Sequence, residues 1–273
     1  MTRPVVRSGP SEPARAPAGV CHERALAAFC SVPGSVPRVG ARFPRGLAQP
    51  EQGFRFSRDA LLLADFAAGL KLPPAAAVVD LGAGCGVAGL GLLLRRPDLG
   101  PVVGVERDVF QVEAARLNIR RLGLDERCSV VTGDLKQTAT LRAARAALPA
   151  VPKSGAPFHL ALCNPPWRRE GSGRTPPSPT RRAALFGDET TFPLFLDAAD
   201  RLLAFQGALA LVCGAERLTD VLTALPPRLR PVRLRFVHGR PGKAAAFFLL
   251  EARKGSKAAL RVEAPLLLED ENA

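Results

Sequence analysis

Apolar and polar residues follow one another along the chain in a pattern that alternates between the period of a β-strand and that of an α-helix. Short apolar runs bounded by Gly, Pro or polar residues predict buried strands, and they lie near residues 77–81, 102–106, 128–132, 158–163, 207–213, 231–238 and 244–252. Helix-like stretches fill the gaps, near residues 58–70, 86–96, 109–122, 137–148, 181–204 and 216–225. Strands that alternate with helices indicate a parallel sheet with helices on both faces.

The connection between the last two predicted strands is short and has the sequence G-R-P-G over residues 239–242. A short connection rich in Gly and Pro predicts a hairpin, so the final strand should run antiparallel to its neighbour. The predicted fold class is therefore α/β, with a doubly wound, seven-stranded, mostly parallel sheet whose last strand is antiparallel. Ser57 precedes the first predicted helix and is its expected N-cap.

A glycine-rich segment follows the first predicted strand, with the sequence V-V-D-L-G-A-G-C-G over residues 78–86. Glycine permits positive φ and close approach of the backbone to a ligand, and the helix that follows presents free N–H groups at its start. Asp80 stands just before the turn, where its carboxylate could accept from a ligand's ammonium group. The G-x-G-x-G spacing differs from the G-x-G-x-x-G of dinucleotide-binding proteins, although an NAD site and a tight structural turn remain alternatives. The candidate ligand-binding residues of this segment are Asp80, Gly82, Ala83, Gly84 and Gly86.

Two further acids follow the next two predicted strands. Glu106 ends the second strand, 20 residues after Gly86, which is about the separation at which an acid accepts hydrogen bonds from ribose hydroxyls. Its alternative role is a solvated charge at a strand end. Asp134 follows the third strand, where it could accept from the exocyclic amine of an adenine or cap the helix that follows.

The sequence Asn164-Pro165-Pro166-Trp167 directly follows the strand predicted over residues 158–163. Proline has no backbone N–H and a fixed φ, so two prolines end the strand and make a stiff turn. A polar amide and an indole are thereby held at the carboxyl end of a strand, which is the edge where open α/β sheets bind ligands. The structural alternative is a turn whose Trp only covers part of the core.

These motifs come in the order and spacing of a class I methyltransferase that uses S-adenosylmethionine, and N-P-P-W resembles the (D/N)-P-P-(Y/F/W) signature of amino-group methyltransferases. Within that class the chain resembles the tRNA1(Val) (adenine37-N6)-methyltransferase family. Two other stretches carry the resemblance, Q-G-F-R-F-S-R-D-A-L-L-L-A over residues 52–64 and R-F-V-H-G-R-P-G-K over residues 235–243. The family more often has Tyr at the position of Trp167. The resemblance runs from about residue 36 to the C-terminus.

The resemblance implies a Rossmann-like fold, S-adenosylmethionine as cofactor and the exocyclic N6 amine of an RNA adenine as methyl acceptor, with tRNA as the expected RNA. The Asp80–Gly86 segment, Glu106 and Asp134 would then bind the cofactor. In the N-P-P-W turn, Asn164 Oδ1 and the Pro165 carbonyl would accept the two amine hydrogens and stabilise the charge that develops on the nitrogen. Trp167 would offer a flat face to a base removed from its stack.

The net charge of +13 fits a polyanionic partner. Arginines cluster directly after the N-P-P-W turn and are the best candidates for contacts with an RNA backbone: Arg168, Arg169, Arg174, Arg181 and Arg182. The chain is expected to divide into a mostly disordered basic extension over residues 1–35, a methyltransferase domain over residues 36–260 and a tail over residues 261–273.

Composition agrees with a protein of the cytoplasm. The 273 residues suffice for one large domain. No apolar run is long enough to span a bilayer, and the first residues contain no secretory h-region. The six cysteines form no C-x-x-C pair and no cluster at metal-ligand spacing. We therefore expect reduced thiols, no metal, no membrane partner and a monomer.

Two other functions remain open from the sequence. A protein-glutamine N5-methyltransferase of the release-factor type uses a similar N-P-P-Y motif, and a Gln amide nitrogen fits the same pair of acceptors. The high positive charge and the short, Pro-rich N-terminal region favour RNA. The third possibility is a non-catalytic RNA-binding protein on a methyltransferase fold, against which the intact glycine loop, Glu106 and Asn164 argue.

Overall fold

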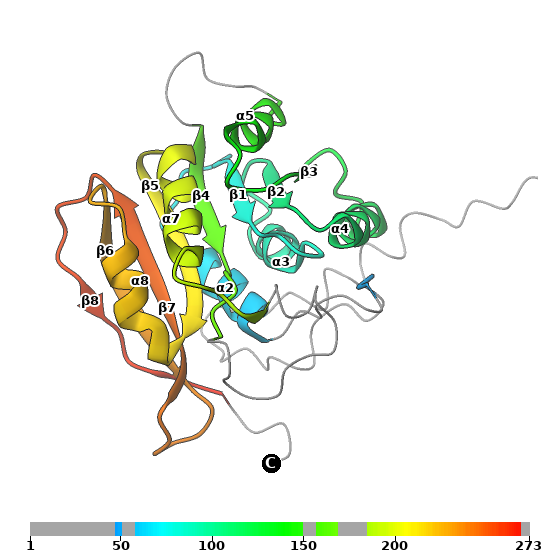
Figure 1. The fold of residues 1–273 in the computed structure, drawn as a ribbon. Helices are drawn as coiled ribbons and strands as arrows, with labels where there is room; N and C mark the ends of the chain where they lie inside the picture. Colours follow the sequence, from blue (N-terminus) through cyan, green and yellow to red (C-terminus); the bar gives the residue numbers. More distant parts are fainter. Residues whose placement is uncertain (1–46, 51–57, 150–156, 169–184, 269–273) are drawn as a thin grey trace, which may run out of the picture.

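The computed structural model describes residues 47–50, 58–149, 157–168 and 185–268 (Figure 1). The predicted extension over residues 1–35, the Ser57 cap, residues 52–57 of the Q-G-F-R-F-S-R-D-A-L-L-L-A stretch and four of the five arginines of the RNA cluster lie outside these ranges. Within them, no helix is long and apolar enough to cross a membrane.

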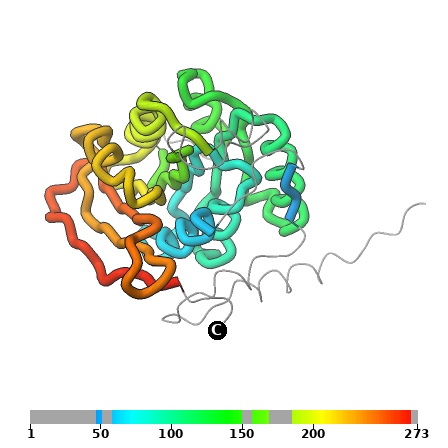
Figure 2. Tube along the Cα trace, turned by 60° about the horizontal axis from the view of Figure 1, so that its bottom comes forward, coloured from blue at the N-terminus to red at the C-terminus, as the bar shows by residue number. Residues whose placement is uncertain are grey.

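The described residues form one central sheet of nine strands, in the order β3-β2-β1-β4-β5-β7-β6-β8, with β9 paired to β6. The C-terminal strands lie together at one edge (Figures 1 and 2). The strands are β1 (Val78–Leu81), β2 (Val102–Glu106), β3 (Cys128–Thr132), β4 (Phe158–Cys163), β5 (Leu203–Gly214), β6 (Leu229–His238), β7 (Ala245–Lys254), β8 (Arg261–Val262) and β9 (Leu266–Leu267).

The pairing confirms the predicted mostly parallel sheet with an antiparallel hairpin at its end. Strands β1 to β5 pair in parallel, and β7 runs antiparallel to both β5 and β6. The two short strands β8 and β9 were not predicted. They pair in parallel with β6, so the sheet continues past residue 260, where the sequence placed the end of the domain.

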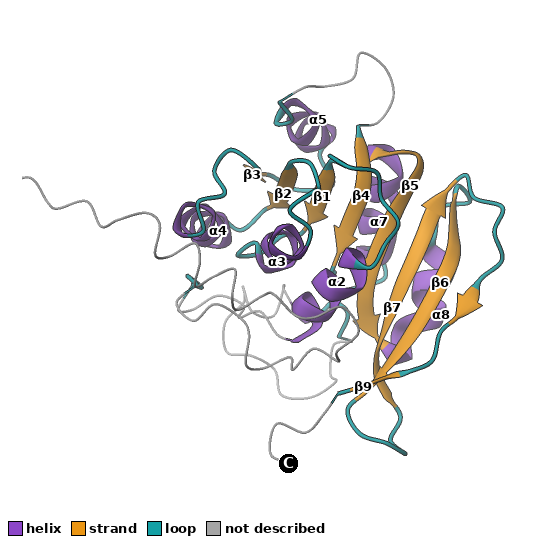
Figure 3. Ribbon diagram, turned by 180° about the vertical axis from the view of Figure 1, so that it is seen from behind, coloured by secondary structure: helices purple, strands orange, loops and turns teal. Residues whose placement is uncertain are grey.

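Helices cover both faces of the sheet, as predicted (Figure 3). Apolar side chains of α2, α3 and α4 pack on one face and those of α5, α7 and α8 on the other, which gives a core on each side. Because both faces are covered, β1 is buried along its whole length. The helices are α2 (Arg58–Ala68), α3 (Val87–Arg95), α4 (Val109–Arg121), α5 (Thr138–Ala146), α7 (Thr191–Leu202) and α8 (Leu218–Ala224).

The helix predicted over residues 181–204 is not continuous in the structure, and its first four residues lie outside the described ranges. Leu185 is helical, residues 186–190 are not, and α7 begins at Thr191, because the residues between Leu185 and Thr191 make other contacts. Phe186 forms a β-bridge with Arg168, and the Asp188 carboxylate accepts from the Thr190 N–H at 3.0 Å. Pro193 lies in the first turn of α7, where a residue without an N–H is tolerated, and would break a longer helix.

A buried polar contact fastens residues 47–50 to the body of the fold. Asn118 of α4 has none of its surface exposed. Its Oδ1 accepts from the Ala48 N–H at 2.6 Å, and its Nδ2 donates to the carbonyls of Ala48 and Cys85 at 3.0 Å each. One amide side chain therefore ties a distant segment to the glycine loop.

We expect Asn118→Ala to lower the free energy of unfolding by about 1–3 kcal/mol, because it leaves three backbone groups without their partner. Urea unfolding followed by circular dichroism measures the change. Arg120→Ala, on the exposed face of the same helix, is the matched control and should change stability by less than about 0.5 kcal/mol. Equal effects of the two substitutions would show that the Asn118 hydrogen bonds do not stabilise the fold.

Candidate active site at the carboxyl ends of the strands

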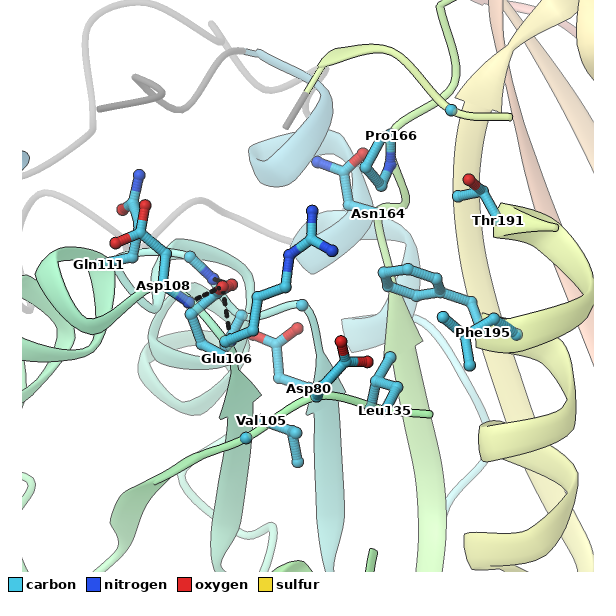
Figure 4. A pocket seen from close by; sticks show the side chains of 18 of the residues that line it. Asp80, Val105, Glu106, Asp108, Gln111, Leu135, Asn164, Pro166, Thr191 and Phe195 are labelled. Atoms are coloured by element: carbon cyan, nitrogen blue, oxygen red, sulfur yellow. Dashed lines mark hydrogen bonds between the residues drawn. The ribbon is translucent and has the colours of Figure 1, made fainter. Parts of the chain in front are cut away.

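A cavity of about 760 Å³ opens at the carboxyl ends of β1, β2 and β4. The sheet order reverses between β1 and β4, which lie side by side in the middle of the sheet, and ligands bind at such a switch point in open α/β folds. Their parallel register pairs Leu81 with Cys163. The glycine loop and the N-P-P-W turn therefore begin at the same level (Figure 4).

The floor of the cavity holds Asp80, which is only 3% exposed. Its Oδ2 accepts from the Gly89 N–H of α3 at 3.0 Å. This contact needs glycine, because a Cβ at position 89 would lie 3.1 Å from Oδ2 and 2.9 Å from Val102. Burial raises the pKa of Asp80 from 3.8 to about 7, against the Gly89 hydrogen bond, and the nearby charge of Glu106 raises it further. A cationic ligand would compensate this buried carboxylate.

The glycine loop passes directly beneath α7. Gly82 has φ of +67°, and a Cβ there would lie 2.9 Å from the Phe195 ring, so both the backbone conformation and the close packing require glycine. The Gly82 and Ala83 N–H groups donate to the Val105 carbonyl at 2.9 and 3.1 Å. The loop is thereby fixed to the end of β2 as well as to β1.

Glu106 uses both carboxylate oxygens on the backbone around the cavity. Its Oε2 accepts from the Gly84 N–H at 2.9 Å, and its Oε1 accepts from the N–H groups of Arg107 and Asp108 at 2.7 and 2.8 Å (Figure 4). An ionised carboxylate has about four acceptor positions, so capacity remains for a ligand hydroxyl. The solvated strand-end role does not fit a residue that holds two loops together.

Asp134 also lines the cavity, after β3. Its Oδ1 accepts from the Lys136 N–H at 2.9 Å, which forms an Asx-type turn. Helix α5 begins four residues later with Gln137 at its N-cap position. Asp134 is therefore not the cap of α5, which was the alternative role that the sequence suggested.

The residues of the N-P-P-W turn separate into two groups. Asn164 and Pro166 line the cavity, whereas Pro165 and Trp167 do not. Pro165 is buried, and the Trp167 indole packs beside Gly214 and edge-to-face with Phe247, at 5.8 Å between ring centroids. The exposed Arg168 has its guanidinium 5.6 Å from the indole centroid. Of the predicted RNA-binding arginines, Arg169, Arg174, Arg181 and Arg182 lie outside the described residues.

A short segment before α7 pairs with this turn. The Arg168 N–H donates to the Leu185 carbonyl at 2.9 Å, and the Gly187 N–H donates to the Arg168 carbonyl at 3.1 Å. A Cβ at Gly187 would lie 2.3 Å from the Pro166 carbonyl oxygen. The segment therefore fits against the turn only because residue 187 has no side chain.

Several cavity residues were missed by the sequence analysis. They come from the N-terminal halves of α4 and α7 and include Phe110, Gln111, Thr191, Leu194 and Phe195. Phe110 is 71% exposed although it is a large apolar residue, and it follows Asp108, whose Oδ1 caps α4 through the Phe110 N–H at 2.9 Å. A Phe at the solvent-facing start of a helix, just after the acid of β2, was a signal for a flat ligand surface.

The described residues contain no group of three or more His, Cys, Asp or Glu side chains arranged for a metal ion. The cavity is lined by carboxylates, backbone groups, the amides of Gln111 and Asn164, aromatic rings and two cationic residues, Arg107 and Lys136. These groups suit a small cationic ligand with a flat ring and hydroxyl groups.

Comparison with known proteins agrees with this geometry. Residues 59–176 match the family model of the methyltransferase small domain. A tRNA1(Val) (adenine(37)-N6)-methyltransferase of Porphyromonas gingivalis is 31% identical over 183 residues, which are 66% of this chain and 66% of that protein. A protein of the same name from a Shewanella species is 28% identical over 167 residues, 61% of this chain and 63% of that protein. The crystal structure of a predicted O-methyltransferase from Agrobacterium tumefaciens is 24% identical, with a TM-score of 0.59, over 79% of this chain and 89% of that one.

The sheet order, the glycine loop and the cavity define a class I methyltransferase fold. More narrowly, residues 59–176 match the methyltransferase small domain, and the chain is similar over about two thirds of its length to proteins named tRNA1(Val) (adenine(37)-N6)-methyltransferase. Methyltransferases of this class use S-adenosylmethionine, which decides against the NAD alternative. The cavity fits that cofactor, because a buried carboxylate, Asp80, lies on its floor, where a cationic group would offset the charge.

The buried acid gives a prediction for stability against pH. Because the pKa of Asp80 is raised in the folded state, the stability that its proton contributes is present below about pH 4 and is lost as pH rises through about 7. Asp80→Asn keeps an acceptor for Gly89 and removes the charge. Without ligand, the variant should be more stable than the parent protein at pH 8.5, by on the order of 2–4 kcal/mol, in urea unfolding.

The same substitution should weaken binding of S-adenosylhomocysteine by at least about tenfold in calorimetry, because the ammonium loses its charged partner. Asp98→Asn, at an exposed ion pair with Arg96, serves as the control and should leave binding unchanged. If Asp80→Asn binds S-adenosylhomocysteine as tightly as the parent protein, Asp80 does not contact the ammonium group.

Proposed function

We propose that this protein transfers the methyl group of S-adenosylmethionine to the exocyclic N6 amine of an adenine in RNA, with tRNA as the substrate. The observation that carries the proposal is that Asn164 and Asp80 line the same cavity from neighbouring parallel strands. The names of the similar proteins and the net charge of +13 support an RNA substrate.

The cofactor side of the cavity is the acidic side. In this proposal Asp80 accepts from the amino-acid ammonium, Glu106 from the ribose hydroxyls, and Asp134 from the adenine amine. The backbone of Gly82, Ala83, Gly84 and Gly86 borders the same ligand. The cofactor supplies an activated methyl group, so the protein needs to hold and orient the acceptor rather than to form a covalent bond with it.

The acceptor side is the N-P-P-W turn. An adenine N6 amine is a weak nucleophile because its lone pair is delocalised into the ring. Asn164 Oδ1 and the Pro165 carbonyl accept the two amine hydrogens, which localises the lone pair and stabilises the positive charge that develops on the nitrogen. Pro166 keeps the turn stiff, since its ring fixes φ.

Trp167 provides the stacking surface for the target base in this proposal. The guanidinium of Arg168 lies 5.6 Å from the centroid of its ring. A base that stacks on this face replaces Arg168, whose charge is then available to a phosphate of the same RNA. Base stacking on an aromatic side chain is worth about 1–3 kcal/mol.

One experiment tests the function directly. The protein is incubated with radiolabelled S-adenosylmethionine in three separate reactions, which contain unmodified tRNA, rRNA or a peptide release factor. The products are digested and identified by mass spectrometry. Label in N6-methyladenosine from tRNA is the expected result. Label in a glutamine of the release factor would replace the proposal by protein-glutamine methylation, and RNA binding without label in any acceptor would indicate a non-catalytic protein.

Asn164→Ala should lower kcat by about 100- to 1000-fold with little change in KM for RNA, because the amide oxygen contributes mainly as charge develops in the transition state. Steady-state methylation assays over a range of RNA concentrations measure both constants. Asn164→Asp retains an acceptor at the same place and should keep part of the activity. If Asn164→Ala keeps the parent kcat, the N-P-P-W turn has a structural role only.

Trp167→Ala should reduce turnover strongly while the affinity for S-adenosylhomocysteine stays within about twofold, since the indole does not border the cavity. Trp167→Tyr keeps an aromatic face and should retain much of the activity. Single-turnover methylation and calorimetry separate the two effects. If Trp167→Ala methylates RNA at the parent rate, the indole only packs.

A further inference from the structure

Arg217 is a buried cation next to the proposed site, and no step above uses it. It ends the short 3₁₀ turn after β5, Ala215–Arg217, and is 5% exposed. A buried charge is costly unless it is paired and hydrogen-bonded. The contacts of Arg217 therefore show which groups compensate its buried charge and which elements it connects.

The guanidinium joins three different elements. Its Nη1 donates to the Trp167 carbonyl at 2.6 Å, and its Nε pairs with the Asp220 carboxylate of α8 at 2.6 Å. Its Cζ lies 4.7 Å from the ring centroid of Phe192 in α7. One side chain thus connects the N-P-P-W turn with α7 and α8.

Two of these three elements form walls of the cavity. The turn contributes Asn164 and Pro166, and the helix of Phe192 contributes Thr191 and Phe195. Backbone hydrogen bonds of Arg168 with Leu185 and Gly187 join the turn to the segment just before α7. The Arg217 side chain contacts both walls directly.

The Trp167 side chain occupies a slot that exists because residue 214 is glycine. A Cβ at Gly214 would lie 2.6 Å from indole Cε3 and 2.7 Å from Cζ3, so the end of β5 leaves room for the ring by having no side chain there. Phe247 of β7 closes the slot with a ring at 89° to the indole. The indole and the main-chain carbonyl of one residue are therefore held by the end of β5 and by the 3₁₀ turn directly after it.

We propose that Arg217 is a positioning residue for methyl transfer, which fixes the Trp167 carbonyl so that Asn164 faces the acceptor nitrogen. The proposal rests on the function proposed above. The turn is held at its start by the pairing of Cys163 in β4 and at its end by Arg217. With both ends fixed and two prolines between them, Asn164 has little freedom to move.

Arg217→Gln should lower kcat by about 10- to 100-fold, the loss expected when a reacting group is misplaced by about 1 Å, whereas the KM for S-adenosylmethionine stays within about threefold. Arg217→Lys keeps the charge for Asp220 but presents a single ammonium in place of the planar fork, so its kcat should lie between those of the parent enzyme and Arg217→Gln.

The chain offers a readout that does not depend on activity. Trp167 is its one tryptophan, and it has no tyrosine, so ultraviolet-excited emission above 300 nm reports on this indole alone. In Arg217→Gln the emission should shift to longer wavelength, and acrylamide quenching should rise about twofold or more, as the turn loosens. Arg127→Gln is the matched control, because Arg127 also donates to the backbone, at the carbonyls of Pro97 and Leu99, but at the opposite end of the strands. It should change neither emission nor kcat.

Tryptophan quenching and kcat together decide whether Arg217 positions the turn for methyl transfer. Increased quenching together with reduced kcat supports the proposal. Parent-like kcat with altered emission, or reduced kcat with parent-like emission, overturns it, since the turn would then move without consequence or not move at all. If Arg217→Gln does not fold, as judged by far-ultraviolet circular dichroism, the same criteria apply to Arg217→Lys. If the parent enzyme labels no RNA or protein, the proposed function fails, while the quenching data still decide whether Arg217 holds the turn.

Discussion

The parallel pairing of β1 with β4 is the constraint on which the cavity depends. Its register sets Leu81 opposite Cys163, and neighbouring strands lie about 4.8 Å apart. The glycine loop and the N-P-P-W turn therefore leave the sheet side by side, one on each side of the point where the strand order reverses. A register shift of one residue would turn the side chain of Asp80 to the other face of the sheet and remove it from the cavity floor.

This geometry separates charge within a strongly basic protein. The chain carries a net charge of +13, yet carboxylates concentrate around the cavity, at Asp80, Glu106, Asp108, Asp134 and Asp188. Much of that negative charge is bound to backbone N–H groups, most completely at Glu106. An interior of this kind favours a cationic cofactor, while the excess of positive charge outside it favours a polyanion. The two ligands of the proposed reaction thus respond to charges of opposite sign, the cofactor to the carboxylates of the cavity and the RNA to the net charge of the chain.

Most of the regular structure could be predicted because it depends on local signals. The bounds of β2, β3 and β4 agree with the prediction, since each strand is a short apolar run closed by a polar residue or proline. The start of α7 was misplaced because the helical pattern was extended through residues that form a bridge at Phe186. Asp188 and Pro193 are the residues of the sequence that mark the start of this helix. The strands β8 and β9 have two residues each and exist only by pairing with β6, so no local pattern could indicate them.

The contacts that hold the loops could not be predicted for a different reason. Asn118 bonds to Ala48, 70 residues away, and Arg217 bonds to Trp167, 50 residues away. Neither follows from a helical or strand period. Loops at the carboxyl edge of an open sheet have no neighbouring strand to satisfy their backbone groups, so side chains from adjoining elements supply the partners. The same hydrogen bonds then determine where the loop stands. A motif such as N-P-P-W provides the reactive groups, but their position depends on residues outside the motif that the sequence does not mark.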